Sequence, residues 1–130
     1  MDSGAIRRRL ALGATVLAAS GALALAVPAT AQASGGGSCA GHEVRTLSFR
    51  TGAVHIYRHN AFVCAVTIPK SVGARRPMSV SIQARGSRPV IDKGTFRYQA
   101  GPVTVHAGHR CVWVTGAVAG QGASSGWILC

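Results

Sequence analysis

The sequence predicts an all-β fold, a small antiparallel β-sandwich or barrel-like domain with two disulfides. Apolar and polar residues alternate with a period of two over most of the chain beyond residue 39. Short turn sequences rich in Gly, Asn and Pro separate these runs, and beyond residue 33 no apolar stripe of helical spacing is long enough for a helix. With 130 residues, the chain has room for one small domain.

The clearest strand signal spans 78–84, where Met78, Val80 and Ile82 alternate with small polar residues. In 61–68 both faces are largely apolar, which predicts a central strand covered on both sides. Further strands are expected around 47–49, 54–56, 96–98, 103–107, 111–118 and 127–130. The side chains expected to face inward are Phe49, Ile56, Phe62, Val66, Met78, Val80, Ile82, Val105, Val112 and Val114.

The C-terminal quarter carries both tryptophans. Trp113 shares a face with Cys111, so it is expected to pack on a disulfide or to line the edge of the core. Trp127 follows Ser124-Ser125-Gly126 and is expected to be partly exposed, where it can anchor a partner. The small residues of 116–126 predict a loop that can dock to a partner.

The N-terminal segment has the pattern of an export signal. Arg7, Arg8 and Arg9 precede an apolar run over 10–27, and Ala31-Gln32-Ala33 forms a small-x-small cleavage site. Such a run is at the lower edge of membrane-spanning length. Because cleavage after Ala33 would remove it, no transmembrane segment is expected in the mature chain. We therefore predict a secretory signal peptide over 1–33, a flexible Gly/Ser leader over 34–38 and a single disulfide-bonded β domain over 39–130.

Disulfides are expected because an exported chain enters an oxidising compartment. The four cysteines are Cys39, Cys64, Cys111 and Cys130, and none has the spacing of a metal-ligand motif. The sequential pairing, Cys39–Cys64 with Cys111–Cys130, is favoured because it closes shorter loops. The second bridge would then tie the arms of a hairpin that turns near Gly120. The nested pairing, Cys64–Cys111 with Cys39–Cys130, remains open.

Charge is the firmest functional observation. Without Asp2 and Arg7–Arg9, the chain keeps 11 Lys and Arg against two carboxylates, a net charge of +9. Because alternate loops of a meander lie at the same end, basic residues are expected at both ends rather than in one pocket. The residues expected to contact polyanions are Arg50, Lys70, Arg75 and Arg76 at one end, and Arg58, Arg85 and Arg88 at the other.

The sequence contains few side chains that could catalyse a reaction or bind a metal. Glu43 and Asp92 are the two carboxylates beyond residue 33, and no motif of a nucleophilic enzyme is present. The five histidines can be arranged around a metal only if distant segments meet, and no neighbouring carboxylate pattern supports this. No catalytic residue, metal site or cofactor is therefore expected. No ladder of aromatic residues alternates with Arg, so no specific nucleic acid is expected either.

Three segments of the sequence resemble those of a known protein family. They are Phe-Val-Cys-Ala-Val-Thr at 62–67, Ile-Asp-Lys-Gly-Thr-Phe at 91–96 and Ala-Gly-Pro-Val-Thr-Val at 100–105, followed by Cys111-Val112-Trp113 and Cys130. Together they resemble the small secreted spore-associated protein A-like family of filamentous actinobacteria. The resemblance implies a secreted β domain at the cell or spore surface, and it transfers no catalytic residue and no ligand site.

Two functions are compatible with these features. The first is a secreted, non-catalytic, strongly basic β protein that associates with the cell wall or spore surface through anionic polymers. The alternative is a soluble cationic effector, such as an inhibitor or antimicrobial binding protein that acts on a specific partner. The sequence does not determine the oligomeric state.

Overall fold

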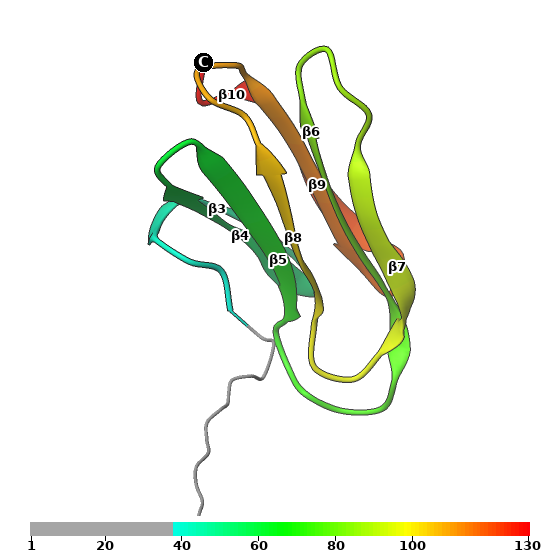
Figure 1. Ribbon diagram of the computed structural model, residues 1–130. Coiled ribbons are helices and arrows are strands. Elements are labelled where there is room, and N and C mark those ends of the chain that lie inside the picture. Colours follow the sequence, from blue (N-terminus) through cyan, green and yellow to red (C-terminus); the bar gives the residue numbers. More distant parts are fainter. Residues whose placement is uncertain (1–37) are drawn as a thin grey trace, which may run out of the picture. The chain divides into compact units, whose positions relative to one another are not determined.

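The computed structural model describes residues 38–130, which form eight antiparallel strands and contain no helix (Figure 1). The signal peptide predicted over 1–33 and most of the leader predicted over 34–38 lie outside the described residues. The strands are β3 (His42–Phe49), β4 (Gly52–His59), β5 (Phe62–Pro69), β6 (Arg76–Ala84), β7 (Val90–Phe96), β8 (Ala100–His106), β9 (Val112–Val118) and β10 (Gln121–Ile128). Accordingly, no helix of this part of the chain is suited to cross a membrane.

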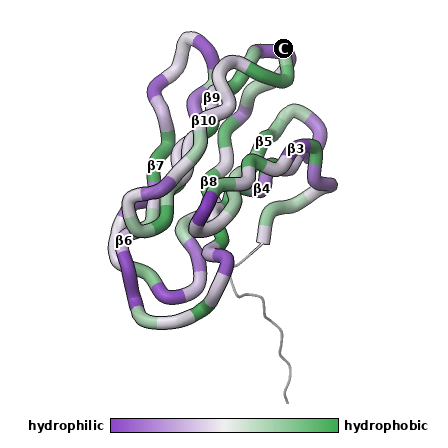
Figure 2. The backbone as a smooth tube through the Cα atoms, turned by 180° about the vertical axis from the view of Figure 1, so that it is seen from behind, coloured by the Kyte–Doolittle hydropathy of each residue, from purple (hydrophilic) through white to green (hydrophobic). Residues whose placement is uncertain are grey.

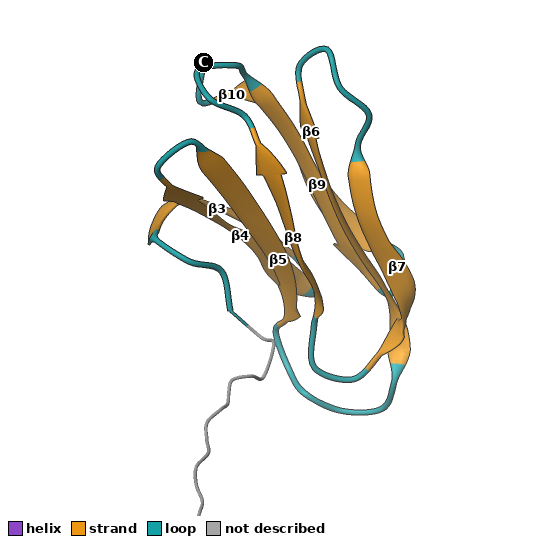
Figure 3. Cartoon of the chain, in the orientation of Figure 1, coloured by secondary structure: helices purple, strands orange, loops and turns teal. Residues whose placement is uncertain are grey.

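The strands form two sheets of four strands that pack face to face as a sandwich (Figure 3). One sheet has the order β3-β4-β5-β8 and the other the order β10-β9-β6-β7. The chain builds β3, β4 and β5 as a meander, crosses to the other sheet for β6 and β7, returns for β8 and crosses again for β9 and β10. The predicted all-β sandwich is confirmed.

Alternate residues of each strand build the core between the sheets. In β6 the side chains of Met78, Val80 and Ile82 are buried, and the serines between them lie on the outer face. Figure 2 shows this alternation as changes of hydropathy along the strands, with hydrophilic stretches in the connections. Each large apolar side chain buried in this way contributes roughly 1.5–3 kcal/mol. The core positions predicted for Ile56, Met78, Val80, Ile82, Val112 and Val114 are confirmed, and Phe49 and Val105 pack against the core while partly buried.

The prediction for β5 was wrong about which face points inward. Ala65 pairs with Ile56 and Thr67 pairs with Val54, so Val63, Ala65 and Thr67 face the core. Phe62 therefore lies on the outer face with 46% of its surface exposed. Val66 is buried on that same outer face, as expected for a central strand covered on both sides. Because both faces of β5 are apolar, only its register with β4 distinguishes them.

The two sheets lie in close contact beside Gly116 in β9. The fully buried Thr67 hydroxyl donates a hydrogen bond across the sandwich to the Ser79 carbonyl, 2.9 Å away. A Cβ atom added at Gly116 would lie 2.3 Å from Thr67 Oγ1 and 2.3 Å from Val54 Cγ2. The absence of a side chain at this position therefore permits the close packing.

The disulfides are Cys39–Cys64 and Cys111–Cys130, so the favoured sequential pairing is confirmed. The first joins the segment before β3 to the middle of β5. The second ties together the open ends of the β9–β10 hairpin, whose turn includes Gly120. Loops of this length give each bridge a contribution of about 3 kcal/mol to stability, chiefly through the unfolded chain. Such bonds persist in an oxidising, extracellular environment.

We expect Gly116→Ala to destabilise the sandwich by about 1–3 kcal/mol, because its Cβ would overlap Thr67 and Val54. Urea denaturation monitored by far-ultraviolet circular dichroism measures this loss. Gly73→Ala is the matched control, because the nearest atom to a Cβ at Gly73 is the flexible end of Arg76 at 3.4 Å. Equal midpoints for the two variants would contradict the close approach of the sheets.

Candidate functional site

The first group of predicted contact residues gathers at one end of the sandwich. Arg50 precedes the Thr51 carbonyl that accepts a hydrogen bond from the Lys70 backbone N–H at 2.8 Å. Arg75 and Arg76 lie where the β5–β6 connection enters β6, and Arg75 Nη2 donates to the Thr95 carbonyl at 3.0 Å. Arg50, Lys70, Arg75 and Arg76 thus share one end, together with Arg97, which was not among the predicted contact residues.

The second group lies at the opposite end. Arg58 ends beside the β8–β9 connection, where its Nη1 donates to the Gly108 carbonyl at 3.4 Å. Arg85 and Arg88 belong to the β6–β7 connection. Arg110 joins these segments, because its Nη1 donates to the Arg85 carbonyl at 3.2 Å and to Ser87 Oγ at 2.9 Å. Arg110 has a structural role here, and its importance depends on a contact between distant loops that no local pattern reveals.

Over residues 38–130 no Lys or Arg side chain is paired with a carboxylate. Asp92 accepts a hydrogen bond from the Gly101 backbone N–H at 2.7 Å and thereby holds β7 against the start of β8. Glu43 is engaged with Thr46 and His55. The positive charge of the surface is therefore not neutralised within the described part of the protein.

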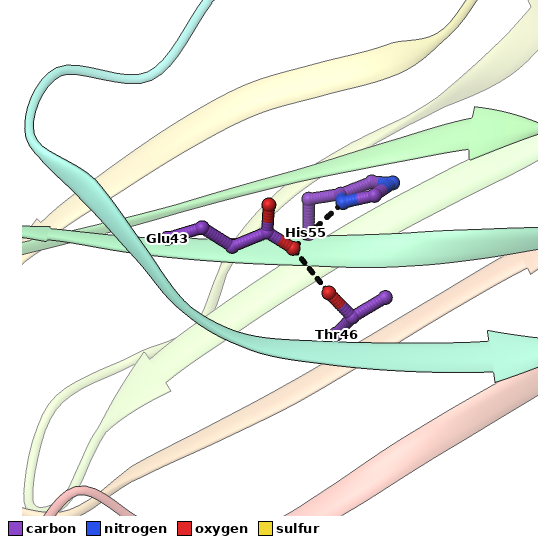
Figure 4. A network of polar contacts seen from close by, with 3 residues as sticks. All are labelled: Glu43, Thr46 and His55. Atoms are coloured by element: carbon purple, nitrogen blue, oxygen red, sulfur yellow. Dashed lines mark hydrogen bonds and ion pairs between the residues drawn. The ribbon is translucent and has the colours of Figure 1, made fainter.

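The Glu43 carboxylate forms the centre of a small polar network on the outer face of the β3-β4-β5-β8 sheet (Figure 4). It accepts a hydrogen bond from the Thr46 hydroxyl and lies 2.9 Å from His55 Nδ1. The Thr46 hydrogen bond, and after it the contact with His55, lower the pKa of Glu43 below its ordinary value of 4.5. The network joins β3 to β4 at the β-bulge between Glu43 and Arg45.

The histidines do not converge in the described structure. His55 contacts Glu43, whereas the His106 ring packs edge-on against Phe62 with centroids 5.1 Å apart. Between residues 38 and 130, no three His, Cys, Asp or Glu side chains lie close enough to hold a metal ion. Their positions on outer faces and in turns leave them as surface groups.

The tryptophans lie together on the outer face of the other sheet. Trp113 and Trp127 are paired neighbours in β9 and β10, with ring centroids 5.4 Å apart and planes at 81°. Arg85 Cζ lies 5.0 Å from the centroid of the Trp127 ring, within cation–π distance. Each indole is 37% exposed. The exposure expected for Trp127 is confirmed. Trp113 lies on the outer face beside Trp127 and not at the edge of the core.

The loop predicted over 116–126 is also corrected, because these residues form the end of β9, a tight turn and most of β10. The small side chains that suggested a loop instead allow close packing. A Cβ at Gly122 would meet the Gly116 carbonyl oxygen at 2.3 Å.

Comparisons with known proteins return no matching family model, no similar curated protein and no similar solved structure. The candidate site is therefore defined by its own chemistry: two cationic ends, and between them a sheet face with two exposed indoles.

We expect the Glu43 network to make stability depend on acid pH. A carboxyl with a lowered folded pKa stabilises the fold above its unfolded pKa, and the stabilisation disappears as the pH falls through the folded pKa. Wild type should therefore melt at a higher temperature than Glu43→Gln at about pH 6, and the difference should vanish by about pH 2. Thermal melts by circular dichroism measure this difference.

Thr46→Val keeps the carboxylate but removes the hydrogen bond that lowers its pKa most. It should therefore reproduce much of the loss caused by Glu43→Gln. A gap between wild type and Glu43→Gln that is the same at both pH values would contradict this interpretation.

Proposed function

We propose that the protein is a secreted, non-catalytic, basic β-sandwich protein that associates with the cell or spore surface through anionic polymers. The observation that carries the proposal is the net charge of +9 beyond the signal segment, combined with the lack of any Lys or Arg paired with a carboxylate over residues 38–130. Unpaired surface cations attract polyanions and release their counterions on binding.

Export is supported by two independent features. The N-terminal segment has a charged region, an apolar run and a small-x-small site. All four cysteines are joined in disulfides, which persist outside the reducing cytoplasm. The resemblance to the spore-associated protein A-like family supports the cell or spore surface as the destination.

The distribution of charge favours an extended polymer over a compact anionic ligand. Basic groups lie at both ends of the sandwich, whereas a compact ligand would need them around one pocket. A polymer chain can contact both ends at once, which raises avidity through many weak contacts. The proposal assigns no catalytic residue, because each of the two described carboxylates accepts hydrogen bonds that support the fold.

We expect binding to isolated cell-wall or spore-coat material to weaken at least about tenfold between 50 and 200 mM NaCl. Sedimentation of the material with bound protein measures the affinity, and an uncharged glucan is the control. Salt-independent retention, or none at the lower salt concentration, would disprove the proposal.

Charge removal at either end should weaken binding further. Arg50→Gln with Lys70→Gln tests one end and Arg88→Gln tests the other, because no hydrogen bond of these three side chains supports the fold. Each change should reduce the salt dependence as well as the affinity. An effect confined to one end would indicate a focused site instead of an extended contact.

A further inference from the structure

A β-bulge in β10 places Trp127 beside Trp113. Ser124 pairs with Thr115 and Trp127 pairs with Trp113, so three steps along β10 match two steps along β9. Gly126 adopts a φ of 68° at the bulge, and Ser125 Oγ accepts a hydrogen bond from the Val114 backbone N–H at 2.9 Å. A bulge of this kind re-aims the side chain that follows it. With regular pairing, Gly126 would have faced Trp113 and the second indole would have pointed toward the core.

Below the indoles, the same outer face carries rows of small hydroxyl side chains. Thr115 and Ser81 are cross-strand neighbours whose hydroxyl oxygens lie 2.8 Å apart, and Ser124 continues the row on β10. Each hydroxyl retains capacity for another hydrogen bond; Ser124 is exposed, and Thr115 and Ser81 are partly buried. The next row along β6 contains Ser79 between Ala117 and Lys93.

The face ends in an open groove of about 460 Å³ at the Lys70 end of the sandwich. Its lining includes Ser79, Lys93, Thr95, Ala117 and Gly120. From Gln83 beside the indoles to Pro77 at this groove, β6 advances six residues, which is about 20 Å of extended strand. This outer face, which we call the track, therefore extends from one cationic end to the other.

The charge along this track has one sign. Arg85 lies over Trp127 at one end, Lys93 lies beside Ser79, and Arg75 is bonded to the Thr95 carbonyl at the other end. Asp92 alternates with Lys93 in β7 and points inward to the Gly101 N–H, so among the described residues no Asp or Glu side chain lies on the track. By contrast, the outer face of the other sheet contains Glu43.

We propose that this track binds an acidic polysaccharide, with Trp113 and Trp127 as its aromatic platform. Sugar rings have an apolar face of C–H bonds that packs on an indole ring, and a rim of hydroxyls that fits the Ser and Thr rows. Acid groups along the polymer pair with Arg85 and Lys93. The inference rests on the proposed function and identifies which anionic polymer is bound, and where.

A second copy of the chain is a poorer occupant of this face. A symmetric dimer through the track would bring the Arg85 and Lys93 side chains of both copies into one interface, where like charges repel. The row of hydroxyls would also need partners on a matching row. A polymer with alternating hydroxyl and acid groups satisfies both requirements.

The two indoles provide a direct test, because Trp113 and Trp127 are the only tryptophans in the chain. The purified protein is titrated with a galacturonate oligosaccharide at low salt while tryptophan emission, acrylamide quenching and calorimetric heat are recorded. We expect a saturable change in emission and protection from acrylamide. Polyphosphate, which has charge but no sugar rings, should bind through the cations without protecting the indoles, and an uncharged glucan of the same length should bind at least about tenfold more weakly.

Variants then assign the contact. Trp113→Ala and Trp127→Ala should each weaken galacturonate binding at least about tenfold. Tyr98→Ala, which removes an aromatic side chain exposed elsewhere, should leave binding unchanged. Arg85→Gln should weaken binding more than Arg45→Gln, which removes the same charge from β3 of the other sheet.

The outcomes separate this inference from the proposed function. Galacturonate binding without indole protection, or equal affinity of the Trp and Tyr98 variants, would overturn the track and leave polyanion binding intact. Indoles already protected in a dimer before ligand is added would also overturn it. Absence of binding to any polyanion would overturn both proposals. If a variant fails to fold, indole protection in the wild type still decides the question.

Discussion

The close approach of the two sheets at Gly116 is the constraint on which the rest of the sandwich depends. Space that a side chain of β9 would occupy is filled by Thr67 and Val54 of the opposite sheet. The Thr67 hydroxyl finds its acceptor in the Ser79 carbonyl of β6, and leaving a buried hydroxyl without one costs about 1–3 kcal/mol. This contact therefore fixes both the separation of the sheets and the register between them, because a shift of either strand would leave Thr67 without a partner.

With the inner faces committed to packing, functional chemistry is confined to the outer faces and the connections. The inner residues of β6 are apolar, and the outer residues of the same strand are Ser79, Ser81 and Gln83. Strand alternation thus allows one segment to supply both the core and a hydroxylated surface. Most of the basic residues lie in the connections, and none of those over residues 38–130 is paired with a carboxylate.

Much of the fold could be predicted because one period dominates the sequence. In 78–84 the apolar residues occupy one face only, so its inward side is unambiguous. In 61–68 both faces are apolar, and the choice between Phe62 and Val63 depends on pairing with β4, which alternation does not encode. The first part of the strand at 121–128 was predicted as a loop because its residues are small, whereas their size is what allows Gly122 to lie against Gly116.

The two halves of the candidate site differ in predictability for a physical reason. Antiparallel strands reverse direction at every connection, whether or not the chain changes sheets, so Arg50 and Arg58 must fall at opposite ends. The indole pair has no such guarantee, because strict alternation would send Trp127 inward when Thr115 faces Ser124. Only the extra residue of the bulge brings the ring to the surface, and Ser125-Gly126 is its sequence signal: a glycine that tolerates positive φ beside a hydroxyl that satisfies the freed Val114 N–H. The bulge therefore converts a core position of β10 into a surface one. It places the Trp127 ring beside Arg85, at the cationic end that also carries Arg58 and Arg88.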